Sequence, residues 1–301
     1  MKILIAGASG MVGQALIKHL HHHDIITVGR SEKKLQKLFP RLRALTWSSL
    51  ENFKEPVDLI IHLCGENIGT HYWTEKFKQK IISSRVNTAQ NLIDWIKNNH
   101  FNPRILAANA VGYYGCYIDH HSPIFSEESY QDEGNPQSFL QKTAFQWQNG
   151  WHDCPENISV TFMRFGVILD KNYGMLKQLS FSFKYGLGAI LGSGQQYISW
   201  ITLEDLVQAI DFIIQHKGIL GPINLVSPSP VSQMIFSKTL AQALKKPLFL
   251  KLPGKLIKII FGQMGEELLL SGQYVIPKRL NDAGFVFQHP QIDKALKHIF
   301  K

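Results

Sequence analysis

The sequence predicts an α/β protein in which a parallel β-sheet carries helices on both faces, with a smaller, mostly helical domain at the C-terminus. Three observations support this prediction. Short apolar runs alternate with segments of helical periodicity over roughly the first 170 residues. The apolar runs lack polar alternation, as expected for strands that are buried on both faces. Beyond them, helical segments interrupted by prolines dominate the chain.

Each strand is predicted from one apolar run, and each helix from the periodicity of the segment between two runs. The clearest helix begins at Thr74, which can cap it, and carries an apolar stripe from Phe77 to Ile96. A further helix is expected over residues 138–150. The predicted strands cover residues 3–6, 25–28, 42–45, 57–63, 104–108 and 158–164, and a later helix and strand cover 203–216 and 223–226.

The change from alternating strand and helix patterns to mostly helical segments predicts two domains. Residues 1–228 are expected to form the sheet domain, in which residues 170–200 contribute to a substrate cleft. Residues 229–301 are expected to form a small substrate or lid domain. Neither an internal repeat nor a low-complexity segment is present.

Charge and cysteine content restrict the partners and the compartment. Lysine and arginine total 32 against 23 acidic residues, a formal charge of +9, but the basic residues are scattered, so we expect no nucleic-acid partner. Three cysteines without a CxxC pair predict neither a disulfide framework nor a cysteine zinc site. No apolar run approaches the roughly 20 residues of a membrane helix. A cytoplasmic protein without a membrane partner is expected.

The residues directly after the first strand indicate a phosphate-binding turn with the spacing GxxGxxG. Glycines let the backbone approach a pyrophosphate, and the amide groups and positive dipole of the following helix start bind it. A plain tight turn is the alternative, but the position between a first strand and a first helix favours a Rossmann-type dinucleotide site. The candidate cofactor-binding residues of the turn are Gly7, Ser9, Gly10, Met11, Val12 and Gly13.

The end of the second strand predicts which nicotinamide cofactor is bound. An NAD site usually has an acidic residue there, which accepts hydrogen bonds from the ribose 2′-hydroxyl. This chain instead has Gly29, Arg30 and Ser31. Because an arginine attracts a 2′-phosphate and no carboxylate repels it, NADP(H) is favoured over NAD(H). A solvent-exposed loop residue is the alternative interpretation of Arg30.

Several further motifs carry a family resemblance, and they run nearly from end to end. They are LCGENI at 63–68, GYYG at 112–115, RFGVIL at 164–169, GSG at 192–194, SWI at 199–201 and VIPKRL at 275–280. With the glycine turn, they resemble the extended short-chain dehydrogenase/reductases. More closely, the chain is similar to the nucleoside-diphosphate-sugar-epimerase-like subgroup whose C-terminal domain has no known function.

The resemblance implies a nicotinamide cofactor that lies across the carboxyl edge of the sheet. It implies contacts from Leu63, Cys64 and Gly65 beneath the adenosine half, from Arg85 at the phosphates, and from Gly166 and Val167 beside the nicotinamide. Leu63 and Val167 are alternatively core residues.

The catalytic pattern of the family is incomplete in this chain. Family reductases use a serine or threonine and then a Tyr-x-x-x-Lys pair, in which the lysine lowers a tyrosine pKa of about 10. Here the serine position holds Asn109, and the helix position retains Lys142 without the tyrosine. The same spacing elsewhere in the chain is accidental. Tyr113 and Tyr114 are the best substitute proton donors, and packing of the bend after the fifth strand is their alternative role.

These observations predict an NADP(H)-binding oxidoreductase or epimerase-like enzyme that acts on a small carbonyl or hydroxyl compound. The candidate catalytic residues are Asn109, Tyr113, Tyr114 and Lys142. The alternative is a catalytically silent protein that senses NADP(H) or binds a partner. No metal site is expected, because the histidines at positions 19–23 suit a solvated helix end. A monomer or homodimer is expected.

Overall fold

The computed structural model describes residues 1–301, which form two compact units. The first comprises Met1–Asn109, Phe145–Met163 and Ile210–Pro222. The second comprises Ala110–Ala144, Arg164–Ala209 and Ile223–Lys301. The domain boundary near residue 228 stays a prediction.

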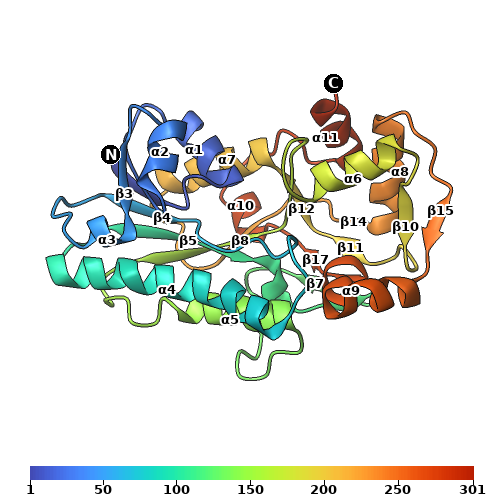
Figure 1. The fold of residues 1–301 in the computed structure, drawn as a ribbon, viewed down its shortest axis with the longest axis horizontal. Helices are drawn as coiled ribbons and strands as arrows, with labels where there is room; N and C mark the ends of the chain where they lie inside the picture. The colour runs from blue at the N-terminus through green and yellow to red at the C-terminus, as the bar shows by residue number, and fades with distance from the viewer. The chain divides into compact units, whose positions relative to one another are not determined.

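A seven-stranded sheet in the order β13-β8-β5-β4-β1-β2-β3 confirms the predicted α/β architecture (Figure 1). The central strand β1 runs parallel to both neighbours, with Leu4 opposite Ile26 on β2 and Ile60 on β4. All three side chains are buried. The strands are β1 (Lys2–Ala6), β2 (Asp24–Gly29), β3 (Arg43–Thr46), β4 (Leu59–His62), β5 (Arg104–Ala110), β8 (Val160–Phe165) and β13 (Ile223–Leu225).

Helices cover both faces of the strands of the first unit, with α4 on one side and α1 and α2 on the other (Figure 1). The Thr74 hydroxyl accepts a hydrogen bond from the Phe77 amide at 3.2 Å, which confirms the predicted N-cap of α4. The apolar stripe of α4, from Phe77 to Ile96, is buried. The helices of this unit are α1 (Met11–His19), α2 (Glu32–Leu38), α3 (Trp47–Leu50) and α4 (Glu75–Asn99), together with the C-terminal parts of α5 (Phe139–Asn149) and α7 (Leu203–Gln215), whose first residues belong to the second unit.

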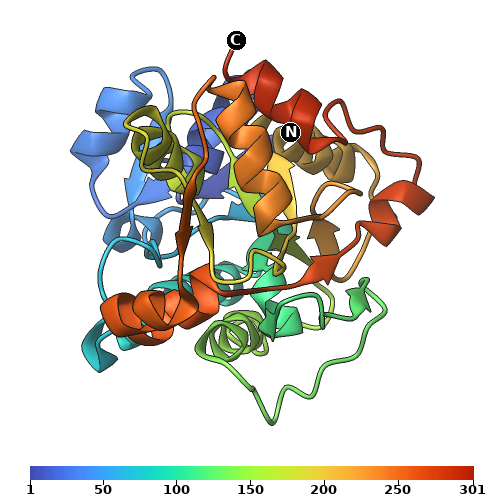
Figure 2. The same ribbon diagram turned by 90° about the vertical axis from the view of Figure 1, so that its right-hand side faces the viewer.

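The second unit is built from short strand pairs and from the predicted C-terminal helices. Its core surrounds Trp200 and Phe236, onto which Leu296 packs, and Figure 2 shows α11 beside α8. The helices are the 3₁₀ turn η1 (Val111–Tyr114), α6 (Gly174–Lys184), α8 (Gln233–Ala243), α9 (Gly254–Leu269), α10 (Lys278–Asp282) and α11 (Ile292–Ile299). The strands are β6 (Tyr117–Ile118), β7 (Ile124–Phe125), β9 (Val167–Leu169), β10 (Ala189–Leu191), β11 (Tyr197–Ile198), β12 (Trp200–Thr202), β14 (Val231–Ser232), β15 (Leu250–Leu252), β16 (Ser271–Gly272) and β17 (Tyr274–Val275).

Two short helices, α2 and α3, were not predicted because each has fewer than eight residues and therefore almost no periodicity. Side-chain caps start them instead: Ser31 caps α2, and Thr46 forms a capping box with Ser49 at α3. None of the helices combines the length and the apolar character needed to cross a lipid bilayer.

Candidate functional site

The glycine turn between β1 and α1 has the backbone geometry that the sequence predicts. Gly7 has φ +89°, in the left-handed region, and its amide donates to the Val28 carbonyl at 3.2 Å. A Cβ on Gly7 would lie 2.8 Å from the carbonyl carbon and oxygen of Leu63. Any side chain at this position would therefore collide with the end of β4.

The start of α1 is open for an anion. Gly10 is the N-cap residue, no side chain caps the helix, and its first turn contains no acidic residue. The helix dipole and the first amide groups are therefore uncompensated. A Cβ on Gly10 would meet only the Gly7 carbonyl oxygen, at 3.3 Å, whereas a Cβ on Gly13 would lie 2.7 Å from the Cα and oxygen of Ala8. The turn thus fits a diphosphate, which needs bare backbone at Gly10.

Two basic side chains and one carboxylate lie close together at the end of β2. Arg30 has a side chain that is 84% exposed, and its Nη1 lies 3.8 Å from Oε2 of Glu66. Lys80 on α4 lies 3.2 Å from the same oxygen. Two cations therefore share one carboxylate, which leaves one positive charge in excess. Arg30 was predicted from the sequence but Lys80 was not, because 50 residues separate them and only the parallel sheet brings α4 to this edge. Ser31 caps α2 through its hydroxyl, at 3.3 Å from the Lys34 amide.

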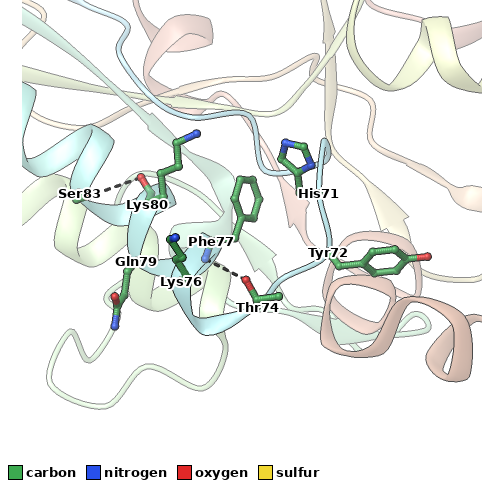
Figure 3. A pocket seen from close by; sticks show the side chains of 8 residues that line it. All are labelled: His71, Tyr72, Thr74, Lys76, Phe77, Gln79, Lys80 and Ser83. Carbon is green, nitrogen blue, oxygen red and sulfur yellow. Dashed lines mark hydrogen bonds between the residues drawn. The ribbon is translucent and has the colours of Figure 1, made fainter.

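Lys80 also lines a pocket of about 750 Å³ at the start of α4 (Figure 3). The Phe77 ring stands between Lys80 and His71, and it packs edge-on against His71 at 5.1 Å between ring centroids (Figure 3). Lys76 adds a second cation to the wall. The lining residues are His71, Tyr72, Thr74, Lys76, Phe77, Gln79, Lys80 and Ser83.

Arg85 lies beneath the turn that follows β4. It is 8% exposed, its guanidinium stacks 4.5 Å from the Trp147 ring, and its Nη1 donates to the Ile81 carbonyl at 2.7 Å. A Cβ on Gly65 would lie 2.9 Å from the guanidinium carbon. Burial lowers the pKa of Arg85 to about 10, and the charge of Glu66 opposes that shift. The Arg85 guanidinium therefore packs directly against the backbone of Gly65.

The two residues before Gly65 are fixed by the sheet. The Leu63 amide donates to the Ala6 carbonyl at 2.8 Å, which continues the β1–β4 pairing. Burial raises the pKa of the Cys64 thiol to about 12, so this cysteine is a neutral packing group at neutral pH.

In the second unit, Tyr113 and Tyr114 surround a buried arginine. The Arg164 guanidinium lies 3.4 Å above the Tyr113 ring, and its Nη1 donates to the Tyr114 hydroxyl at 2.9 Å. Tyr113 donates to Glu133 Oε1 at 2.7 Å, and Tyr114 donates to Asn224 Oδ1 at 2.8 Å. Tyr114 is fully buried and Tyr113 is 7% exposed. Burial raises the pKa of both hydroxyls, that of Tyr113 to about 12.

On α5, the retained lysine lies on the exposed face of the helix. Lys142 is exposed, whereas its neighbour Gln141 is buried. The Gln141 amide nitrogen donates to the Tyr113 carbonyl at 3.4 Å, and its oxygen accepts from the Gln137 amide at 2.8 Å. Asn109 is buried at the end of β5. Gln141 was not predicted from the sequence. Its helical spacing of four residues to Phe145, which is also buried, is the pattern that indicates it.

Gly166 and Val167 connect β8 to β9. The Gly166 amide donates to the Leu225 carbonyl at 3.1 Å, and a Cβ on Gly166 would lie 2.6 Å from the Ser199 carbonyl oxygen. Val167 pairs with Trp200 in a parallel ladder. Strand packing alone therefore requires a glycine at 166, whatever else this segment contacts.

We expect the Tyr113 hydroxyl to keep its proton until about pH 12, because burial and the Glu133 carboxylate both disfavour the phenolate. Since this pKa is higher in the folded than in the unfolded chain, its contribution to stability is lost as the pH rises from about 10 towards 12. The near-ultraviolet titration of the wild type minus that of Tyr113→Phe should show one phenolate step near pH 12, while circular dichroism reports that the fold persists. A step at or below pH 10 would contradict the buried, carboxylate-bonded geometry.

The parallel sheet, the glycine turn and the helices on both faces define a Rossmann-like protein of the short-chain dehydrogenase/reductase type. The chain belongs to the NAD dependent epimerase/dehydratase family, whose model matches residues 3–225. A second model, a domain of unknown function (DUF1731), matches residues 252–299. Both matches confirm the resemblance that the sequence motifs carry.

Relatives cover nearly the whole chain. An epimerase family protein of Mycobacterium bovis is 33% identical over 98% of this chain and 96% of its own length. The crystal structure of the human epimerase family protein SDR39U1 with NADPH superposes with a TM-score of 0.89 at 27% identity, covering 100% of this chain and 99% of that one. A nucleoside-diphosphate sugar epimerase of Corynebacterium glutamicum gives a TM-score of 0.77 at 28% identity, where this chain spans 58% of the other.

Proposed function

We propose that this protein binds NADP(H) at the glycine turn and is an oxidoreductase or epimerase-like enzyme for a small carbonyl or hydroxyl compound. One observation carries the proposal: the uncapped start of α1 behind a turn whose glycine at position 7 has φ +89°. The similar human protein was solved with NADPH, which supports a nicotinamide nucleotide as the ligand. The remaining predicted contacts, Leu63 to Gly65, Arg85 and Gly166 to Val167, belong to the same proposal.

The preference for NADP(H) over NAD(H) rests on the charge cluster at the end of β2. Arg30 and Lys80 share only Glu66, so a 2′-phosphate would find two cations and one anion. A phosphate dianion is a better partner for an exposed arginine than a carboxylate 3.8 Å away. A ribose 2′-hydroxyl has no acidic residue at Gly29–Ser31 to accept its hydrogen bond.

We expect Arg30→Ala to weaken NADPH binding by about 10- to 100-fold, the loss of one hydrogen-bonded charge pair of about 1.5–3 kcal/mol. NADH binding should stay within about two-fold, since NADH has no 2′-phosphate. Isothermal titration calorimetry with both nucleotides measures the two affinities. Lys37→Ala on α2 is the matched control, because it removes the same charge from an exposed position at the far end of that helix. Equal losses for NADPH and NADH would contradict the preference.

The residues around Arg164 suit proton donation. Tyr113 holds its proton at neutral pH, so it can act as a general acid but not as a general base. Arg164, 3.4 Å above the ring, stabilises the phenolate that remains after proton transfer. A bound nicotinamide supplies or accepts the hydride. These properties favour reduction of a carbonyl. The contacts of Tyr114, which is fully buried, favour its packing role.

The test of the enzyme is NADPH consumption with a panel of small aldehydes and ketones, followed by absorbance. We propose that Tyr113→Phe lowers kcat by at least about 100-fold, the contribution of a positioned general acid. Tyr130→Phe is the control, because Tyr130 is 84% exposed. Asn109→Ala and Lys142→Ala test the other two candidates. Turnover that survives Tyr113→Phe unchanged would remove that residue from the mechanism.

A catalytically silent NADP(H) sensor or partner-binding protein is the second candidate, and one observation favours it. The lysine that lowers the tyrosine pKa in family reductases is here Lys142, which is exposed, while the buried position beside the Tyr113 turn holds the neutral Gln141. Tight binding of NADPH without consumption by any compound of the panel, together with a partner captured only in the presence of NADPH, would support this candidate over the enzyme.

A further inference from the structure

Three potential metal ligands converge in the second unit, and none of them belongs to the glycine turn or to the group formed by Tyr113, Tyr114 and Arg164. Nε2 of His289 and Nε2 of His298 each lie 3.2 Å from the same atom, Oε2 of Glu204. The two imidazole rings stack with centroids 4.4 Å apart. One atom from each of the three side chains lies within 4.8 Å of the other two. This is the only group of three such ligands that converges in the structure.

Two of the three ligand spacings match a tetrahedral ion, and the third lies within 4.8 Å, so the two imidazoles approach each other when the ion binds. With bonds of about 2.0–2.2 Å, Zn²⁺ keeps its ligand atoms about 3.3–3.5 Å apart. The two nitrogen–oxygen distances of 3.2 Å are close to the edges of that tetrahedron. Two imidazoles and one carboxylate are a donor set that zinc accepts, and they leave the fourth position open.

The fold holds the three ligands from three separate segments. Glu204 lies in the first turn of α7, His289 in the loop before α11, and His298 in the last turn of α11. The buried carboxylate of Asp205 accepts the Gln288 amide at 2.7 Å and the His289 amide at 3.0 Å, which positions the loop. Asp205 thus fixes the backbone from which the His289 side chain extends.

The packing of α11 positions the third ligand. Its residues Ile292, Ala295 and Leu296 are buried in the core of the second unit, so the helix cannot rotate freely. His298 is thereby kept at the same oxygen as His289, although its own side chain is 53% exposed. The backbones of the loop and of α11 thus bring the two histidines to the same side of Glu204.

We propose that Glu204, His289 and His298 bind one Zn²⁺ ion. The ion ties the last helix of the chain to the start of α7, and its fourth position takes water. Beside Glu204 and His298 lies a pocket of about 200 Å³ from which this water is reached, lined also by Asp170, Lys171 and Thr202. The proposal is independent of NADP(H) binding, because none of these residues belongs to the glycine turn or to the tyrosine–arginine cluster.

A titration with ZnCl₂, followed by calorimetry, tests the site. The background is the full chain with His21→Ala and His22→Ala, which removes exposed histidines of the N-terminal run as competing ligands. We expect one Zn²⁺ per chain, and a rise in Tm on adding zinc, because the folded state binds the ion through ligands that unfolding separates. His298→Ala and Glu204→Gln should each weaken binding by at least about 10-fold. Both side chains are about half exposed, so these variants should fold.

His216→Ala is the matched control, since this histidine lies at the other end of α7, and it should bind zinc as the background does. Visible absorption after Co²⁺ substitution gives a second readout, because tetrahedral Co²⁺ absorbs strongly and octahedral Co²⁺ does not. Binding that survives both His298→Ala and Glu204→Gln, or no stoichiometric binding in the background chain, would overturn the proposal. The three side chains would then form only a histidine–carboxylate ion-pair cluster.

Discussion

Replacing Gly10 by alanine is expected to weaken NADPH binding by at least about 10-fold, or about 1.4 kcal/mol, while the free energy of unfolding falls by about 1 kcal/mol or less, since alanine is a poorer N-cap than glycine. Gly10 has an ordinary φ of −78°, and its added Cβ would meet only one protein atom, at 3.3 Å. The methyl group therefore fits once the Gly7 carbonyl oxygen moves by a few tenths of an ångström. A diphosphate does not tolerate it, because the methyl stands at the uncapped start of α1, where the bare backbone must approach it.

Gly13→Ala supplies the comparison. Its Cβ would lie 2.7 Å from backbone atoms of Ala8 and Gly7, so the helix must move away from the turn. We expect a loss of about 1–3 kcal/mol in the free energy of unfolding, as for other overpacked positions, together with weaker NADPH binding. Urea denaturation and calorimetry on both variants separate the two effects. Wild-type affinity for NADPH in a folded Gly10→Ala protein would show that the turn is not the phosphate site.

Acidification from pH 7 to pH 5 is expected to lower the free energy of unfolding by about 2 kcal/mol through His62 alone. This histidine at the end of β4 is fully buried, and burial, aided by the charge of Arg85, lowers its pKa to about 3. In the unfolded chain it titrates near 6.5. Because the unfolded state takes up the proton first, the stability that a neutral His62 provides is present above pH 6.5 and declines as the pH falls towards 3.

The His62→Gln variant isolates this contribution. Glutamine retains a polar atom for the Thr88 hydroxyl, which lies 2.8 Å from His62 Nε2, but it does not titrate. Chemical denaturation at pH 5, 6 and 7 should give a shallower dependence on pH in the variant than in the wild type. The slopes are compared rather than the absolute stabilities, because the substitution also changes the packing against Trp151. Equal slopes would contradict the buried neutral state of His62.

The glycine turn was predictable from the sequence because all of its parts are close together in the chain. A strand, three glycines at fixed spacing and a helix specify the positive φ of Gly7 and the bare N-cap at Gly10 without distant contacts. The capped start of α4 at Thr74 was predictable for the same reason. The two candidate proton donors, Tyr113 and Tyr114, were predictable from the sequence, but their hydrogen-bond partners were not. Those partners, Glu133 and Arg164, are 20 and 50 residues away in the chain.

Local patterns in the chain therefore establish the α/β class, the order of its elements, the phosphate turn and the membership of an epimerase family. The environment of each titratable group is a property of the folded molecule. Burial gives His62 its low pKa and Tyr113 its high one, and helix rotation turns Gln141 rather than Lys142 inwards. Packing also brings His289 and His298 to one oxygen of Glu204. These groups are far apart in the sequence and come together only in the folded chain. Burial and short distances between charges shift their pKa values only after folding.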